Sequence, residues 1–99
     1  MAQIVYSRNG LANLERLYRF LADKNPDAAI RAVRTIRDKV KVLSRHPRLG
    51  RIDSEQPDCR ELLIPFGDAG YVARYLLDGK TVIILAVRHA REAGYYVGS

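Results

Sequence analysis

The residues best suited to chemistry in this chain lie near its C-terminal end, in the segment RHAREAGYY at positions 88–96. The segment places guanidinium, imidazole and phenol groups directly after the most apolar run of the chain, residues 82–87. Such groups are favoured both in RNA cleavage sites and at protein interface hot spots, and composition does not choose between the two. The candidate residues are Arg88, His89, Arg91, Tyr95 and Tyr96.

Two further arginines, Arg60 and Arg74, fall within predicted strands. A charged side chain inside a sheet needs a carboxylate, a phosphate or water as its partner. Glu61 across the strands, or Asp58, would serve as an internal partner. Alternatively, both arginines line an open sheet face on which an anionic ligand sits. The residues themselves support these two interpretations equally.

Other kinds of active site have little support in the sequence. The glycine patterns that cradle phosphates are absent, and Gly67 and Gly70 are predicted to be turn residues. Cys59 has no second cysteine to pair with and lies in no metal-ligand cluster, so it is predicted to be a small, semi-buried hydrophobic residue. We therefore expect no disulfide, no metal and no cofactor.

Length and composition predict one domain, residues 1–99, in a reducing cytoplasm and with no membrane segment. The formal charge of +6 comes from thirteen arginines and four lysines against eleven acidic residues. The planar donor fork of arginine suits carboxylates and phosphates, so the expected partner is nucleic acid or an acidic protein segment. The excess charge also favours solubility by itself.

The N-terminal part predicts a short strand, residues 3–6, and an amphipathic helix. Ser7 or Asn9 can cap this helix, because either side chain can accept from a free amide at a helix start. Its apolar residues recur at steps of three and four, which predicts that the helix reaches about Lys24.

A second helix is predicted to begin at Pro26, with Asn25 as its cap. It is expected to end near Arg45 or His46, because Pro47 disfavours helical geometry in the residue before it. The tight connection between the helices implies an antiparallel pair. The predicted apolar face of the second helix consists of Ile30, Val33, Ile36, Val40 and Leu43.

A polar loop at 47–58 is followed by three predicted strands, at 59–64, 71–77 and 81–88. Asp78-Gly79 between apolar alternations predicts a hairpin. The last strand is apolar on both faces, so we expect it inside the sheet and beside the first strand. The predicted fold class is α+β, in the order β-α-α-β-β-β, with a helical hairpin packed on a small, mainly antiparallel sheet.

Four segments carry the clearest pattern of this chain: SRNGLANLERLYRFLADKNPDAAIRAVRTI, HPRLGR, CRELLIP and GYVARYLLDGKTVIILAVRHAR. Through these segments the chain resembles, over nearly its whole length, the RelE/ParE superfamily toxins of bacterial type II toxin–antitoxin systems. The last segment is the most specific, because it resembles the superfamily's succession of an arginine strand, a Tyr-x-x-x-Tyr strand and an apolar strand ending in His-x-Arg.

The resemblance implies one of two activities. RelE-like members cut messenger RNA in the ribosomal A site, and here Arg60, Arg74, His89, Arg91 and Tyr96 would then be the catalytic residues. ParE-like members poison DNA gyrase, which blocks replication, and are not known to catalyse anything. In that branch the target of this chain would be gyrase or the gyrase–DNA complex. In both branches a cognate antitoxin, ParD-like in the second, wraps the toxin and neutralises it in a hetero-oligomer.

The departures from the superfamily favour the ParE-like branch. RelE-like ribonucleases tend to carry lysines after the second helix, yet this chain has none between Lys41 and Lys80. Arginine is a poor proton donor because it stays protonated. We therefore expect a non-enzymatic gyrase inhibitor, with a messenger RNA endoribonuclease and a small basic nucleic-acid-binding module as alternatives. The expected target-binding residues are Arg60, Arg74, Arg88, His89, Arg91, Tyr95 and Tyr96.

Overall fold

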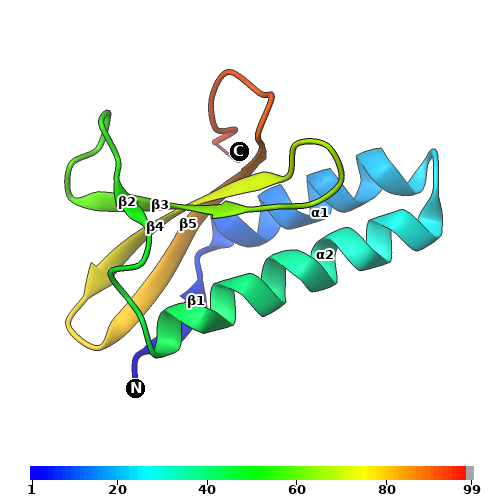
Figure 1. The fold of residues 1–99 in the computed structure, drawn as a ribbon. Helices are drawn as coiled ribbons and strands as arrows, with labels where there is room; N and C mark the ends of the chain where they lie inside the picture. The colour runs from blue at the N-terminus through cyan, green and yellow to red at the C-terminus, as the bar shows by residue number, and fades with distance from the viewer. Residues whose placement is uncertain (98–99) are drawn as a thin grey trace.

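A computed structural model of the chain describes residues 1–97. Two helices pack on one face of a five-stranded sheet with the strand order β1-β5-β4-β3-β2 (Figure 1). In chain order the elements are β1 (Gln3–Tyr6), α1 (Arg8–Ala22), α2 (Pro26–Lys41), the 3-10 helix η1 (Val42–Ser44), β2 (Arg51–Ile52), β3 (Cys59–Ile64), β4 (Tyr71–Asp78) and β5 (Thr81–His89).

The sheet topology confirms the predicted α+β fold. Strand β1 runs parallel to β5, and the other neighbouring strands are antiparallel. Strand β5 lies between β1 and β4, as its apolar sequence predicts. Within the described residues, no helix has the length and the apolar character needed to cross a membrane.

Each helix begins at a predicted cap. The Ser7 hydroxyl accepts a hydrogen bond from the Gly10 N–H at 3.0 Å, and the Asn25 side chain accepts from the Ala28 N–H at 3.1 Å. These bonds satisfy amides that have no partner within the first turn of a helix. The sequence therefore located both helix starts.

The buried face of α2 differs from the predicted one. Ile30 is 46% exposed and Val33 is only half-buried. Ala29 and Ala32 lie in the core instead, because their small side chains allow α2 to approach its neighbours closely. The buried residues of α2 are Ala29, Ala32, Ile36 and Val40, and Leu43 follows them in η1.

The predicted helix ends are slightly too late. Helix α1 ends at Ala22, and the regular part of α2 ends at Lys41. The chain then tightens into η1, and the Arg45 and His46 N–H groups donate to the Val42 carbonyl at 3.2 and 3.0 Å. Helix-like bonding thus reaches the predicted end in a different form.

The loop predicted at 47–58 contains the edge strand β2. Arg51 pairs with Glu61 and Ile52 pairs with Arg60 in the antiparallel ladder with β3. Two residues are too few to show an alternating pattern, so only the pairing with β3 makes this strand visible.

The hairpin between β4 and β5 is confirmed, but its two-residue loop is Gly79-Lys80, because Asp78 pairs with Thr81. Gly79 has a φ of +59°, which residues with a side chain rarely adopt and which suits the first position of such a loop.

A bulge in β5 joins the sheet to the start of α1. Residue Leu85 has no partner in β4, because Arg74 pairs with Ala86 while Tyr75 pairs with Ile84. Its carbonyl oxygen accepts from side chains at the start of α1. The donors are Asn9 Nδ2 at 2.9 Å and Ser7 Oγ at 3.3 Å. Asn9 therefore bonds α1 to the bulge of β5, and Ser7 rather than Asn9 is the helix cap.

Tyr75 holds the loop after η1 against the sheet. Its side chain is fully buried, and its hydroxyl donates to the Pro47 carbonyl at 2.7 Å and accepts from the Gly50 N–H at 2.9 Å. A Cβ at Gly50 would lie 2.7 Å from the Tyr75 ring and 2.8 Å from the Glu61 carbonyl oxygen. Only glycine fits there, so the sheet fixes the course of this loop.

We expect Tyr75→Phe to destabilise the protein by about 1–3 kcal/mol, because it leaves the buried Gly50 N–H and the part-buried Pro47 carbonyl without this partner. Urea unfolding monitored by circular dichroism measures the change. Tyr18→Phe, at a partly exposed tyrosine on α1, removes a hydroxyl of the same kind and should cost less than about 0.5 kcal/mol. Equal stability of the two variants would contradict the assigned role of Tyr75.

Candidate functional site

The C-terminal segment, residues 90–97, folds back over the sheet from the end of β5 (Figure 1). Glu92 fixes this turn: its carboxylate accepts two hydrogen bonds from Arg16 of α1, each 3.1 Å long, and one from the His89 N–H at 2.8 Å. Arg88 closes the same turn by donating to the carbonyl oxygens of Ala90 and Glu92. The turn is therefore anchored to both a helix and a strand.

A buried asparagine on α1 holds the rest of this segment. Asn13 is only 2% exposed; its side-chain oxygen accepts from the Val87 N–H at 2.9 Å and its amide donates to the Tyr96 carbonyl at 3.1 Å. Strand β1 ends at Tyr6, before it can pair with this part of β5. Asn13 was not identified from the sequence. The only feature that could have indicated its role is that a polar residue lies beside the apolar stripe of α1.

Tyr95 lies on the face of the sheet opposite the helices. Its hydroxyl donates to the Glu61 carboxylate at 2.6 Å, and its ring stacks against two guanidinium groups. The Arg74 guanidinium lies 4.4 Å from the ring centroid and that of Arg88 lies 5.2 Å from it. We call Glu61, Arg74, Arg88 and Tyr95, together with Asp53, the open-face cluster.

Asp53 is the partner of Arg74. Arg74 Nε donates to the Asp53 carboxylate at 2.6 Å, and Asp53 is only 2% exposed. The second carboxylate oxygen accepts from the backbone N–H of Glu55 at 2.9 Å. The predicted internal partners, Glu61 and Asp58, are therefore wrong. The correct carboxylate could not be identified from the sequence because it lies in the loop after β2.

The prediction that Arg60 and Arg74 line one open face is also wrong. In the ladder between β3 and β4, Arg60 pairs with Tyr75 and Glu61 pairs with Arg74, so the two arginines lie on opposite faces. Arg60 instead donates to the Gly50 carbonyl at 2.8 Å, on the helix side. Arg60 therefore supports the loop after η1.

The remaining predicted residues lie around α1 rather than in the open-face cluster. The His89 ring packs edge-on against Tyr71, with ring centroids 5.6 Å apart. Tyr96 is 55% exposed, and its ring centroid lies 3.9 Å from the Arg16 guanidinium. Together with the exposed Arg91, these residues line a pocket of about 570 Å³. The predicted set thus divides among three places, which are the open-face cluster, this pocket and, for Arg60, the loop after η1.

The pKa shifts disfavour base or nucleophile chemistry at the open-face cluster. Burial, together with the hydrogen bond to Glu61, raises the pKa of Tyr95 far above its usual value, so the phenol stays neutral and is a poor base. Burial also raises the pKa of the Cys59 thiol, as expected for an unreactive cysteine. Among the described residues, no group of three or more His, Cys, Asp or Glu side chains could hold a metal ion.

A second surface with binding character is a groove of about 720 Å³ between β1 and the helices. Its apolar lining includes Ile4 of β1 and the two α2 side chains left outside the core, Ile30 and Val33. Three cations, Arg34, Arg37 and Lys41, line the same groove with one carboxylate, Asp38, which lies 4.0 Å from the Lys41 ammonium. The groove therefore combines apolar surface with positive charge.

Residues 4–94 match a family described as the ParE toxin of the type II toxin–antitoxin system parDE. The chain belongs to this family. Its relatives also include toxins named after RelE, so the RelE/ParE resemblance seen in the sequence is confirmed.

Two relatives of this ParE-family chain come from Caulobacter vibrioides. Toxin RelE3 is 38% identical over 80 residues, which cover 81% of this chain and 85% of that protein. Toxin RelE1 is 33% identical over 89 residues, which cover 90% and 94%. A solved structure of the chromosomal ParDE system from P. aeruginosa has the same fold, with a TM-score of 0.78 at 24% identity, over 92% of this chain and 98% of that one.

We expect stability to fall as the pH drops through about 4. Burial alone would raise the pKa of Asp53, but hydrogen bonds from the Glu55 N–H and from Arg74 outweigh it and hold the pKa below its usual value. The pKa of Glu92 is lowered in the same way by Arg16. The unfolded chain therefore takes up protons first, and the stability that these carboxylates provide above their ordinary pKa is lost on acidification.

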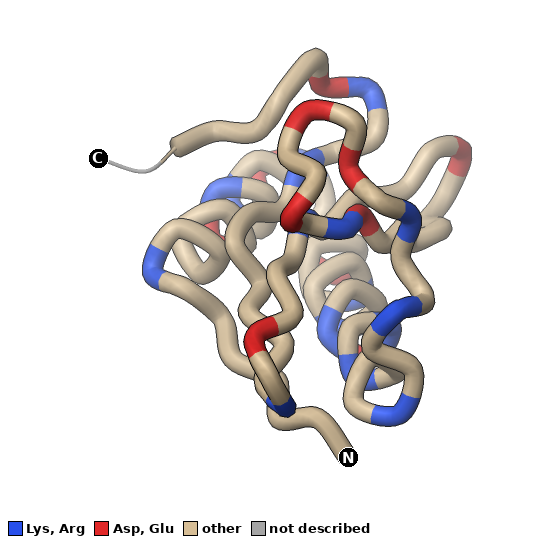
Figure 2. Tube along the Cα trace, turned by 90° about the vertical axis from the view of Figure 1, so that its left-hand side faces the viewer, with Lys and Arg blue, Asp and Glu red and all other residues tan. Residues whose placement is uncertain are grey.

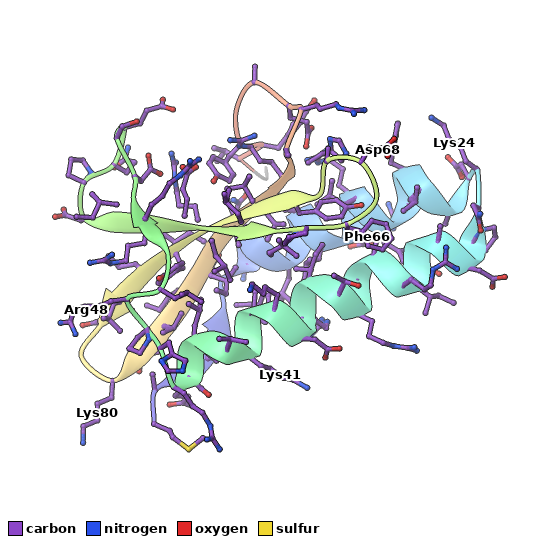
Figure 3. The ribbon with its side chains drawn as sticks, viewed as in Figure 1. Lys24, Lys41, Arg48, Phe66, Asp68 and Lys80 are labelled. Carbon is purple, nitrogen blue, oxygen red and sulfur yellow. The ribbon has the colours of Figure 1, made fainter. Side chains whose placement is uncertain are left out.

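Asp53→Asn should lower the free energy of unfolding at pH 7 by about 2–3 kcal/mol and flatten its decline between pH 5 and pH 3. Urea unfolding at several pH values measures both effects. Asp68→Asn, at an exposed carboxylate labelled in Figure 3, is the matched control and should follow the unmodified protein. An unchanged pH profile for Asp53→Asn would exclude the buried ion pair as the cause.

Proposed function

We propose that this ParE-family toxin inhibits DNA gyrase by binding to it, and that an acidic antitoxin neutralises the toxin. The observation that carries the proposal is the internal compensation of the open-face cluster. Arg74 is paired with the buried Asp53, and Tyr95 donates to Glu61. Groups held in this way are unsuited to proton transfer or to binding a scissile phosphate, so binding through exposed residues is favoured.

A second candidate function, messenger RNA cleavage, is favoured by one feature of the site. His89, Arg91 and Tyr96 line the same pocket and supply an imidazole, a guanidinium and a phenol. The names of the relatives RelE3 and RelE1 are also consistent with this branch. However, the chain has no lysine between Lys41 and Lys80 to act as a cationic acid.

Two assays with purified protein separate these functions. The first measures supercoiling of relaxed plasmid by gyrase, and the second measures cleavage of messenger RNA on translating ribosomes. The proposal requires inhibition in the first assay and intact messenger RNA in the second. Cleavage at the A site with normal supercoiling would establish the ribonuclease function instead.

We expect Arg91→Ala combined with Tyr96→Ala to raise the concentration needed for half-inhibition of gyrase roughly 30-fold. Exposed arginine and tyrosine side chains on a fixed turn have the character of interface hot spots, which cost about 2 kcal/mol or more when truncated. The turn itself is held by Arg16 and Glu92, which remain in place.

The matched control for this pair is Arg31→Ala combined with Tyr18→Ala, at exposed positions on the helices. Circular dichroism should show that both double variants are folded. If the Arg91 and Tyr96 variant inhibits gyrase as well as the control does, this surface is not the gyrase contact.

The groove between β1 and the helices suits an amphipathic, acidic antitoxin segment. Apolar residues of such a segment would cover Ile30 and Val33, and its carboxylates would meet Arg34 and Arg37. Ordering of the segment would accompany binding, as in other coupled folding and binding reactions. Electrostatic attraction should make the association rate fall as the salt concentration rises.

Ile30→Asp should weaken antitoxin binding tenfold or more, because it places a charge on the apolar part of the groove next to an acidic partner. Isothermal titration calorimetry with the cognate antitoxin measures the affinity. Phe20→Asp adds the same charge at an exposed apolar residue outside the groove and should leave the affinity within about threefold. Equal losses in the two variants would place the antitoxin elsewhere.

A further inference from the structure

A group of cations gathers at the end of the molecule that carries the start of β1. The Ala2 N–H donates to the Ser44 carbonyl at 2.7 Å and the Gln3 N–H donates to the Lys80 carbonyl at 2.7 Å, so η1 and the β4–β5 loop meet at this end. Figure 3 shows the labelled Arg48 and Lys80 at this end and Lys24 at the opposite one. We define the basic end as the cations Arg45, Arg48 and Lys80, together with His46 between the two arginines.

The basic end is not compensated by acidic side chains in the described structure. The sequence contains no Asp or Glu between Asp38 and Asp53, a stretch that includes Arg45 and Arg48. None of the five ion pairs among residues 1–97 involves a residue of the basic end. In Figure 2 most of the red acidic segments lie away from the N-terminus, while blue predominates near it. Asp78 is the acidic residue closest in sequence to Lys80.

The loop that carries Arg48 is held more firmly than an ordinary surface loop. The buried Tyr75 hydroxyl bonds to Pro47 and Gly50 on either side of it. Arg60 donates to the Arg48 carbonyl at 3.3 Å and to the Gly50 carbonyl at 2.8 Å. A backbone fixed in this way presents its cations at a lower cost in conformational entropy on binding.

The shape of the basic end disfavours an amphipathic peptide. Two hollows lie at this end. One of about 340 Å³ is lined by His46, Pro47, Arg48 and Leu49, and one of about 500 Å³ is lined by Met1, Ser44, Arg45 and His46, so each has at most two apolar lining residues. The groove at β1 is larger, about 720 Å³, and is lined by several apolar residues. Phosphate contacts require only cations and donors at an accessible surface, without an apolar floor.

We propose that the basic end binds the phosphate backbone of double-stranded DNA. The choice of DNA over RNA rests on the proposed function, because gyrase acts on DNA and a toxin bound to it would meet DNA. The contact is independent of sequence, since it is made to phosphates rather than to base edges. It is also separate from the gyrase contact at Arg91 and Tyr96, which lies around the C-terminal turn.

The test measures binding of the purified chain to a fluorescent 20-base-pair DNA duplex at several salt concentrations, without gyrase. Replacing Arg45, Arg48 and Lys80 by Gln should weaken binding at least tenfold at low salt. It should also reduce the slope of log affinity against log salt by about 3, roughly one for each phosphate contact. The matched control replaces Arg8, Lys24 and Arg31 by Gln, which removes the same charge from exposed residues elsewhere.

Retention of the full salt slope by the control supports a localised DNA surface. Equal losses in both triple variants would overturn it, because only net charge would then matter. Tighter binding to an RNA duplex of the same length, or to a polyglutamate peptide, would overturn the choice of DNA. Supercoiling inhibition is measured separately, so gyrase inhibition without DNA binding would refute this inference alone, and DNA binding without gyrase inhibition would refute only the proposed function.

Discussion

The ion pair between Arg74 and Asp53 determines what the open face of the sheet can do. A guanidinium within a sheet requires a partner, and here the partner is a buried carboxylate from the loop after β2. The same carboxylate accepts hydrogen bonds from backbone N–H groups of its own loop. Asp53 therefore both fixes the conformation of this loop and neutralises the charge of Arg74 on β4. The Tyr95 ring can then lie over the Arg74 guanidinium and bring the C-terminal segment back onto the sheet.

Because the open face is compensated internally, the positive charge available to partners lies elsewhere. It is found around the C-terminal turn, along the groove between β1 and the helices, and at the basic end. These surfaces belong to different elements, so the proposed partners would not compete for one site. This arrangement agrees with the proposal of a toxin that acts by binding and is neutralised by an antitoxin.

Local sequence signals located most of the fold, and the errors have specific causes. Caps at Ser7 and Asn25 act within one turn, so they could be predicted without knowledge of the tertiary structure. The buried face of α2 could not, because Ala29 and Ile30 are both apolar and only packing against the sheet decides which one is covered. Strand β2 was missed for a similar reason, since its two residues become a strand only by pairing with β3.

The sequence by itself determined the order of the two helices and of the four longer strands, the family and the excess of arginine, because these depend on residue types and on spacing along the chain. Only the tertiary structure decided which charged side chains are available to bind a partner and which are paired within the protein. Arg60 and Arg74 look equivalent in the sequence, yet strand register places them on opposite faces, where one supports a loop and the other is paired. Side chains alternate across a strand, and the partners of a buried charge come from distant segments, so long-range contacts decide its role.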